Sequence, residues 1–222
     1  SESHLGSLHN WTSSAVPLES MGFERSSISA PEAVLSKDVL AKYADLRDVP
    51  SVQGTSRLSV HLRFGTMSIR EAAKAGFKHS EKWLTELIWR DFYQHIMHAF
   101  PHSMKDAFRP KYDLVPWRHD DEHFERWTQG KTGYPLVDAG MRELLATGFM
   151  HNRVRMVVAS FFCKHLLLDW RLGERHFAAH LLDFELASNV GGWQWAAGSG
   201  CDAAPYFRVF NPTSQLQKFD RK

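Results

Sequence analysis

The chain has 222 residues, 43% of them apolar and 13% aromatic, which is enough for one large domain or two small ones with a sizeable core. Its 27 Lys and Arg against 25 Asp and Glu give a formal charge of +2, too balanced to indicate nucleic-acid binding by itself. Two cysteines exclude a disulfide framework and a four-cysteine metal site, and the thirteen His show no metal-ligand spacing. No stretch approaches the ~18 apolar residues that a membrane span needs. We expect no membrane contact and a reducing, cytoplasmic setting, with the nucleus as the alternative in a eukaryote.

The first helical signal comes after a polar leader. Residues 1–30 are rich in Ser and Gly and are interpreted as a linker or leader, without the apolar core of a signal peptide. From Pro31 onward, apolar residues recur at helical spacing up to Tyr43, and Pro50 marks the end of this helix. Residues 51–68 are dense in Gly, Ser and Thr and predict a loop that leads into short helices.

The next predicted helix starts at Ser80, a suitable N-cap, and ends at Pro101. One face carries the apolar positions 84, 87, 88, 92 and 96, which predict a buried stripe. The other face includes Glu86 and Arg90, four residues apart, which on an exposed helix form an ion pair. Trp83 and Trp89 flank this pair, and because exposed Trp is uncommon they favour a pocket over an ordinary solvated face.

Three further helices are predicted over 135–148, 151–169 and 174–188, separated by polar or Gly-containing segments. No alternating run of strand length occurs, so the predicted fold class is all-α with ten or more helices. Asp183 could pair with Arg155 as a plain inter-helix ion pair or as part of a site. The segment GTSRLS could bind phosphate through hydroxyl and backbone N–H groups. The residues alone indicate an aromatic-lined helical pocket and name no ligand.

Long segments of the chain carry a family resemblance. They are GTSRLS, ELIWRDFYQH, GKTGYPLVDAGMRELLATGFMHNRVRM, DWRLGER and ASNVGGWQWAAGSGCDAAPYFRVFNP, in this order. From about Tyr43 to Asp220 the chain resembles the catalytic half of DNA photolyases and cryptochromes. The resemblance implies that residues 31–222 form a helical FAD- and DNA-binding domain. It also implies that an α/β domain with an antenna chromophore precedes this piece, and that further C-terminal helices follow it.

By this resemblance, FAD is the expected cofactor and particular residues should hold it. The phosphates are assigned to Tyr43, Thr55, Ser56, Arg57, Leu58 and Ser59, and the cavity wall to Trp83, Glu86 and Arg90. The flavin is assigned to Asn152, to Arg155 paired with Asp183, to Glu185 and to Asn189, the last beside N5. Two positions depart from the family pattern: Glu185 stands where many relatives have Asp, and Phe149 replaces a common Trp.

The resemblance also assigns residues to damaged DNA and to electron transfer. Glu86 should hydrogen-bond the pyrimidine edge, and lesion or backbone contacts are expected from Trp89, Asn152, Arg153, Met156, Trp195 and Arg208. Trp193, Trp170 and Trp117 match the inner, middle and surface members of a tryptophan relay that reduces the flavin in light.

The implied function is light-driven repair of cyclobutane pyrimidine dimers by a monomeric lyase whose partner is damaged DNA. Asn189 favours repair, since plant cryptochromes usually carry Asp and animal ones Cys at that position. Two alternatives stay open: a cryptochrome-type blue-light receptor that binds FAD without repair, and a helical interaction module that has lost FAD.

Overall fold

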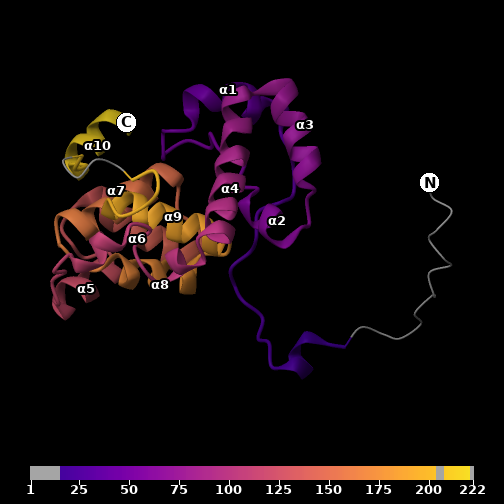
Figure 1. The fold of residues 1–222 in the computed structure, drawn as a ribbon. Helices are drawn as coiled ribbons and strands as arrows, with labels where there is room; N and C mark the ends of the chain where they lie inside the picture. The colour runs from indigo at the N-terminus through magenta and orange to yellow at the C-terminus, as the bar shows by residue number, and fades with distance from the viewer. Residues whose placement is uncertain (1–15, 204–207, 221–222) are drawn as a thin grey trace.

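The structure is a computed structural model that describes residues 16–203 and 208–220. Over these residues it is helical, and extended structure is limited to one isolated bridge between Arg118 and Leu168, which confirms the all-α prediction (Figure 1). The α-helices are α1 Lys37–Leu46, α2 Ser59–Phe64, α3 Ile69–His79, α4 Glu81–Ala99, α5 Asp121–Thr128, α6 Pro135–Thr147, α7 Asn152–Lys164, α8 Trp170–His180, α9 Leu186–Ala197 and α10 Pro212–Phe219. Short 3-10 helices are η2 Leu18–Met21, η3 Pro101–Met104 and η4 Pro110–Leu114.

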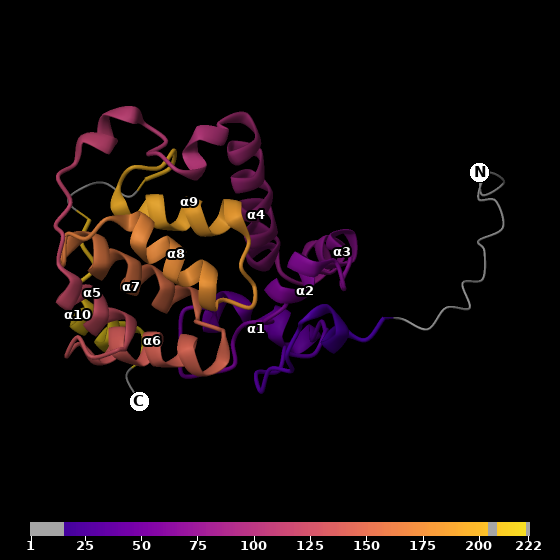
Figure 2. The same ribbon diagram turned by 90° about the horizontal axis from the view of Figure 1, so that it is seen from below.

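The helices form two groups joined by α4. Helices α1 to α4 surround a small core, and α5 to α9 surround a larger one that contains Trp127, Trp170 and Trp193. Helix α4 packs on α1 and α3 in the first group and on α9 in the second (Figures 1 and 2). The smaller core consists of Leu40, Tyr43, Leu58, Ala72, Trp83 and Leu87. Side chains of the predicted site therefore lie where the two groups meet.

The predicted buried stripe of α4 is partly wrong. Ile88 is 59% exposed, whereas Trp83, assigned to the opposite face, is only 4% exposed. Gly76 of α3 explains the difference, because a Cβ at this residue would lie 3.0 Å from the Trp83 ring. The missing side chain lets α3 approach closely, so that Trp83 fills the space between α3 and α4.

The predicted helix over 174–188 is also wrong. Helix α8 ends at His180, and α9 begins at Leu186, where the Glu185 carboxylate accepts hydrogen bonds from the N–H groups of Ala187 and Ser188. Helix α9 then continues through Gly191 and Gly192 to Ala197. The sequence does not distinguish the acidic N-cap Glu185 from helix interior, and it predicts a stop at two glycines that are helical: Gly191 packs against the Tyr93 ring, and Gly192 is exposed.

The other observed helix boundaries lie closer to the predicted ones. Helix α1 begins at Lys37, six residues after Pro31, because the Ser36 hydroxyl caps it by accepting from the Val39 N–H. Helix α5 was not expected in the polar segment, and the Asp120 side chain caps it. Helix α7 ends at Lys164, short of the predicted 169. Helix α6 runs from Pro135 to Thr147 with Gly148 as its C-cap, which agrees with the prediction to within one residue.

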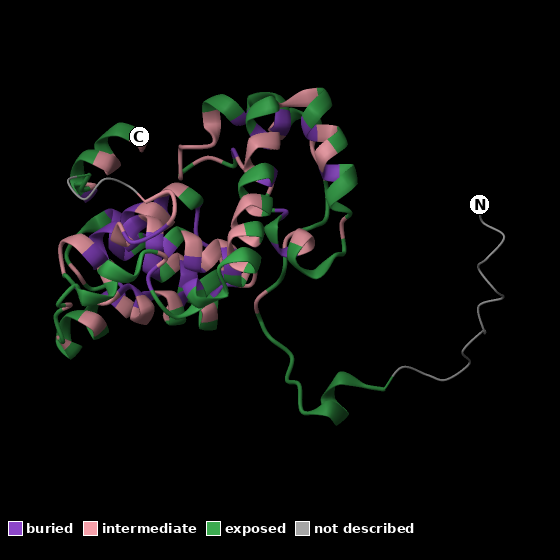
Figure 3. Ribbon diagram, in the orientation of Figure 1, coloured by how far each residue is buried: buried purple, intermediate pink, exposed green. Residues whose placement is uncertain are grey.

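Before α1 the chain runs as an extended arm. Its described part contains only η2, and nearly all of residues 16–30 are exposed (Figure 3). The predicted leader over 1–30 lies partly outside the described residues and stays a prediction. In the described ranges no helix is long and apolar enough to cross a bilayer.

Candidate functional site

The ion pair expected between Arg155 and Asp183 is present. Arg155 on α7 donates from Nη2 to both carboxylate oxygens of Asp183, at 3.1 and 3.0 Å, and from Nε to the Met150 carbonyl at 2.7 Å. The Asp183 side chain is 8% exposed. Because Asp183 lies in the connection between α8 and α9, the pair fixes this connection against the start of α7.

The loop over residues 55–59 meets the same region through an aromatic ring. Arg57 adopts a left-handed backbone conformation with φ of 52°. Its guanidinium lies 4.4 Å from the centroid of Phe149 and 3.9 Å from the Glu143 carboxylate. The Arg155 guanidinium lies 5.8 Å from the same Phe149 ring. Phe149 therefore makes cation–π contacts with two cations, one from each helix group.

Helix α4 contacts the loop region through two predicted side chains. The indole Nε1 of Trp83 donates to the Ser56 hydroxyl at 3.3 Å, and Arg90 reaches the Leu62 carbonyl of α2 at 3.5 Å. Arg63 of α2 in turn donates from Nε to the Phe184 carbonyl at 2.7 Å. The Arg63 bond connects the first helix group to the α8–α9 connection, and the other two lie within that group.

Glu86 does not make the ion pair with Arg90 that its spacing suggests. Its carboxylate pairs with Arg47 at the end of α1, whose guanidinium lies 5.3 Å from the Tyr43 ring centroid. Burial, and next the negative charge of Glu86, raise the pKa of Tyr43 to about 12. Arg47 is closer because α1 packs directly on α4. Tyr43, Arg47 and Glu86 thus form one polar group at this junction.

Asn189 on α9 is held by α8. Its Nδ2 donates to Glu174 twice, to the carboxylate Oε1 at 2.9 Å and to the main-chain carbonyl at 3.1 Å. Burial raises the pKa of Glu174, and the hydrogen bond from Asn189 opposes that shift. Glu185, four residues earlier, is occupied as the α9 cap and also accepts from the Ser188 hydroxyl at 2.7 Å. Its predicted role beside the flavin stays a prediction.

The residues assigned to DNA differ in their solvent exposure and in whether they already have a partner. Trp89 is 43% exposed, Asn152 and Arg208 are exposed, and Met156 and Trp195 are half-buried. Arg153 is engaged: its Nη2 donates to Asp48 at 2.8 Å, and its guanidinium lies 4.4 Å from the Phe219 ring of α10. No structural finding tests these DNA contacts, and they stay predictions.

Two of the three tryptophans of the expected relay lie in the core, and the third lies nearer the surface. Trp193 and Trp170 are each 2% exposed, and Trp117 is half-buried. Next to Trp117, Arg118 donates its N–H to the Leu167 carbonyl at 2.8 Å, which brings this segment beside the start of α8 and Trp170. Trp193 packs against the rings of Phe177, Phe162 and Trp127, with centroids 5.0, 5.6 and 6.0 Å away.

Comparison with known families decides the classification. A family described as the FAD binding domain of DNA photolyase matches residues 83–222. The chain belongs to this photolyase family. The match spans α4 to α10 and includes Arg155, Asp183 and Asn189, so the resemblance inferred from sequence is confirmed.

Individual photolyase relatives support the same classification. The chain is 48% identical to the deoxyribodipyrimidine photo-lyase of Neurospora crassa over 196 residues. This alignment covers 82% of this chain and 32% of that protein. A class III photolyase from Agrobacterium tumefaciens matches with a TM-score of 0.79 and 46% identity, over 83% of this chain and 40% of that one. A cryptochrome from Synechocystis sp. PCC6803 matches with a TM-score of 0.75 and 37% identity, again over 83% and 40%. The chain thus spans well under half the length of these relatives.

The residues present suit the FAD of this photolyase family. The 55–59 loop contains the hydroxyls of Thr55, Ser56 and Ser59 and the guanidinium of Arg57, group types that fit a diphosphate. The half-buried Arg155–Asp183 pair and the Asn189 carboxamide offer fixed polar groups that fit the edge of a flavin ring. His151 is 4% exposed, and its Nε2 has no partner among the described residues.

Sequence reasoning missed several residues that contact side chains of the candidate site. Arg47 and Asp48 precede Pro50 at the end of α1, where a cation and an anion look like ordinary surface charges. Glu174 lies four residues after Trp170, so both lie on one face of α8. This spacing is the sequence feature that could have pointed to Glu174. The partners of these residues are 15 to 105 positions away, so spacing could not show the pairings.

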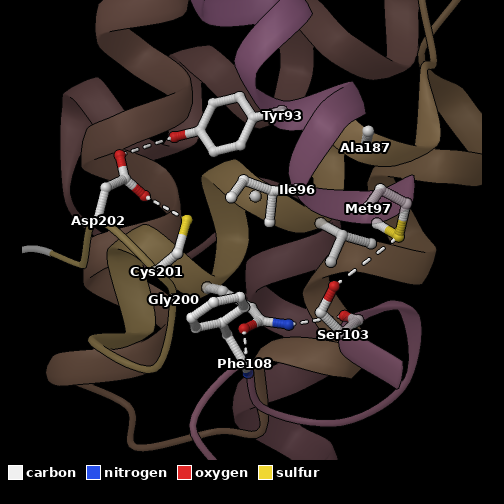
Figure 4. Close-up of a pocket in the computed structure, with 12 residues that line it drawn as sticks. Tyr93, Ile96, Met97, Ser103, Phe108, Ala187, Gly200, Cys201 and Asp202 are labelled. Atoms are coloured by element: carbon white, nitrogen blue, oxygen red, sulfur yellow. Dashed lines mark hydrogen bonds between the residues drawn. The ribbon is translucent and has the colours of Figure 1, made fainter. Parts of the chain in front are cut away.

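A small cavity is lined by residues other than those assigned to the cofactor (Figure 4). It lies between α4, α9 and residues 200–202, and the Tyr93 hydroxyl donates to Asp202 at 3.1 Å beside it. Gln194 on its wall accepts from the Phe108 N–H at 2.8 Å and donates to the carbonyls of Ser103 and Asp106 at 2.8 and 3.0 Å. These bonds attach the segment after α4 to α9.

Proposed function

We propose that this protein repairs cyclobutane pyrimidine dimers in DNA with light, as a deoxyribodipyrimidine photo-lyase. The observation that carries the proposal is the fixed carboxamide of Asn189, held by Glu174 at the position where repair enzymes carry Asn. The identity of 48% to the Neurospora crassa enzyme supports it.

Bound FAD would supply light absorption and one-electron transfer, which no protein side chain provides by itself. The chain's own part is binding and orientation. Tyr43, Leu58 and the hydroxyl groups of the 55–59 loop would hold the phosphate end together with Arg57, and Trp83, Glu86 and Arg90 would line the wall. Arg155 is oriented in advance by Asp183, so it loses little conformational freedom when the ring binds.

Glu86 is suited to hold the edge of a pyrimidine. An ionised carboxylate has two oxygens with about four acceptor sites, so it can keep Arg47 and still accept from a base N–H. Trp89, which is 43% exposed one turn further along α4, and Trp195 offer rings on which a flipped base could stack. Asn152 and Met156 on α7 would complete the pocket wall.

The DNA backbone would be held by cations at the rim. Arg208 is exposed and can reach a phosphate directly. Arg153 is bound to Asp48, so a phosphate would have to compete with that carboxylate. Phosphate contacts of this kind make binding depend on salt.

The test uses an oligonucleotide that contains one thymine dimer. Protein with fully reduced flavin is exposed to blue light, and loss of the dimer is followed by chromatography, with a dark sample as control. Repair is expected in light only, and Glu86→Gln should lower the yield per absorbed photon without loss of flavin. Dimers that persist in light with the flavin fully reduced would overturn the proposal.

The alternative is a blue-light receptor of cryptochrome type, favoured by the match to the Synechocystis protein at 37% identity. It predicts a light-dependent change of flavin redox state while dimers remain. An antenna chromophore on an α/β domain and a monomeric state are further parts of the proposal. An absorption spectrum and a mass measurement in solution would test them.

A further inference from the structure

Phe149 lies in the connection between α6 and α7, where its single ring contacts two guanidinium groups. Arg57 belongs to the loop assigned to the FAD phosphates, and its guanidinium carbon lies 4.4 Å from the ring centroid. Arg155 belongs to the residues assigned to the flavin, and its distance to the same centroid is 5.8 Å. Cation–π attraction extends to about 6 Å, so the Arg57 contact is well within range and the Arg155 contact is at the limit. Phe149 itself has no assigned role towards the cofactor.

The main chain on either side of Phe149 is fixed by hydrogen bonds. The Gly148 carbonyl accepts from the Leu182 N–H at 2.9 Å, and the Met150 carbonyl accepts from Arg155 Nε at 2.7 Å. Both donors belong to the second helix group. The backbone that carries the ring is therefore positioned by the second group alone, and the ring offers a fixed surface to the first group.

Arg57 is the residue that depends on this surface. Its backbone is left-handed with φ of 52°, a conformation that a residue with a side chain keeps only where its surroundings stabilise it. Its side chain is 47% exposed, and the Glu143 carboxylate, 3.9 Å away, is too distant for a hydrogen bond. Within the described part of the chain, Arg57 makes no side-chain hydrogen bond. The Phe149 ring is thus the main contact that orients its guanidinium.

An aromatic ring orients a cation without using up its hydrogen-bond donors. A cation–π contact involves the charge of the guanidinium, so the N–H groups of Arg57 stay available to a phosphate. Glu143 is a weak competitor for them. Burial raises the pKa of Glu143, and the charge of Arg57 opposes that shift. A phosphate oxygen that accepts directly from Arg57 interacts with it more strongly than a carboxylate at 3.9 Å does.

We propose that Phe149 is a positioning residue for the cofactor, whose ring holds the Arg57 guanidinium in the orientation in which it binds the diphosphate of FAD. The proposal rests on the phosphate role that the proposed function gives to Arg57, and it is independent of dimer repair. A side chain that is ordered before the ligand arrives loses less conformational freedom on binding, so the ring increases FAD affinity without touching FAD.

FAD affinity is measured first, in the dark, by titrating FAD into protein stripped of flavin and following flavin fluorescence. Phe149→Leu keeps an apolar side chain but removes the ring, and should weaken FAD binding about three- to tenfold. Phe149→Trp keeps a ring that attracts cations at least as well, and should retain the parent affinity. Phe124→Leu makes the same substitution at a half-buried ring of α5 that packs on Trp127, and should leave FAD affinity unchanged. Parent affinity in Phe149→Leu, or an equal loss in Phe124→Leu, would overturn the proposal.

Action through Arg57 is measured second, by a double-mutant cycle. Arg57→Gln alone should weaken FAD binding more than Phe149→Leu does, because it removes the phosphate contact itself. In the Arg57→Gln background, Phe149→Leu should have little further effect, since the ring then has no cation of the loop to orient. A ring that only packs would lower FAD affinity by the same factor in both backgrounds, and that result would overturn the proposal.

Failure of this inference can be separated from failure of the proposed function. The cycle measures FAD affinity in the dark, whereas the repair assay measures loss of dimers in light. Efficient repair together with no coupling between Phe149 and Arg57 would reject the positioning role alone. Strong coupling in a protein that leaves dimers in place would reject repair alone. Parent affinity in Arg57→Gln would reject the positioning role together with the assignment of Arg57 to the phosphates.

Discussion

Asn189 and Glu174 are joined by a 2.9 Å hydrogen bond from the amide nitrogen to the carboxylate, which connects α9 to α8. A second bond of 3.1 Å runs from the same nitrogen to the Glu174 carbonyl. Because both bonds use Nδ2, the carboxamide oxygen is the end left for another partner. Glu174 thus determines which atom of Asn189 faces the region assigned to the flavin.

The first prediction follows from this pair. Glu174→Ala removes the carboxylate acceptor and should let the Asn189 amide rotate, so reduced flavin should reoxidise several-fold faster in air. Glu174→Gln keeps an acceptor oxygen and should stay near the parent rate. Stopped-flow absorbance of the reduced protein mixed with oxygen measures both rates. Identical rates in all three proteins would contradict a positioning role for Glu174.

Arg155→Ala should destabilise the fold strongly. It leaves the Asp183 carboxylate, 8% exposed, without its partner, and loss of one member of a buried pair costs about 3–5 kcal/mol. Arg155→Lys should recover only part of this, since Lys cannot make the Nε and Nη2 bonds together. Urea denaturation measures the free energy of unfolding.

The control for Arg155 is Arg126→Ala. Arg126 pairs with Glu122 at 3.7 Å with both side chains more than half exposed, and such pairs contribute less than about 1 kcal/mol. A comparable decrease in the free energy of unfolding in the two variants would show that the Arg155–Asp183 pair stabilises the fold no more than an exposed ion pair does.

The neighbouring glycines of α9 should respond to alanine in opposite directions. A Cβ at Gly191 would lie 2.3 Å from the Tyr93 ring, so Gly191→Ala should destabilise the protein by about 1–3 kcal/mol through overpacking. At Gly192 nothing lies within 4 Å, and Gly192→Ala should stabilise the helix by roughly 0.5–1 kcal/mol. Thermal unfolding followed by circular dichroism distinguishes the two. A stabilised Gly191→Ala would mean that Tyr93 does not pack on α9 in this way.

Stability should fall in mild acid partly because of His176. Burial, and next the nearby His180, lower the pKa of His176 from 6.5 to about 4. The unfolded chain therefore binds a proton between pH 6.5 and about 4 that the folded chain does not, so stability is lost as pH falls through this window. His176→Gln should show a smaller loss over the same range.

The measurement for His176 is urea denaturation at intervals from pH 7 to pH 4. Comparison of the variant with the parent cancels the contributions of other titrating groups, including His151, whose pKa burial also lowers. The same pH slope in both proteins would mean that His176 titrates normally in the folded state.

Trp117→Phe tests the relay directly. Phenylalanine packs similarly but is much harder to oxidise, so photoreduction of oxidised flavin should slow by an order of magnitude or more. Repair by protein reduced beforehand should continue, because the flavin then needs no electron from Trp117. Absorbance under blue light follows the first reaction. Unchanged photoreduction would remove Trp117 from the relay.

Local chemistry made much of the fold predictable. The limits of α6 follow from Pro135, which suits a first helical position, and from Gly148, which adopts φ of 66° at the end. Ser80 caps α4 by accepting from the Trp83 N–H at 3.4 Å, as its position in the sequence indicates. These two predictions depend on a few adjacent residues. The Arg155–Asp183 pair is different: the residues alone give Asp183 only as a possible partner, the family resemblance assigns the pair, and the structure contains it.

The sequence alone determined the helical class, the family and the types of side chain available to the site. The tertiary structure decided which of those side chains meet. Glu86 pairs with Arg47 rather than Arg90, Asn189 is held by Glu174, and Ile88 faces solvent while Trp83 is buried. Helical periodicity places a residue on a face, but the partner of that face depends on how distant helices pack, and this is set by the summed burial of both cores.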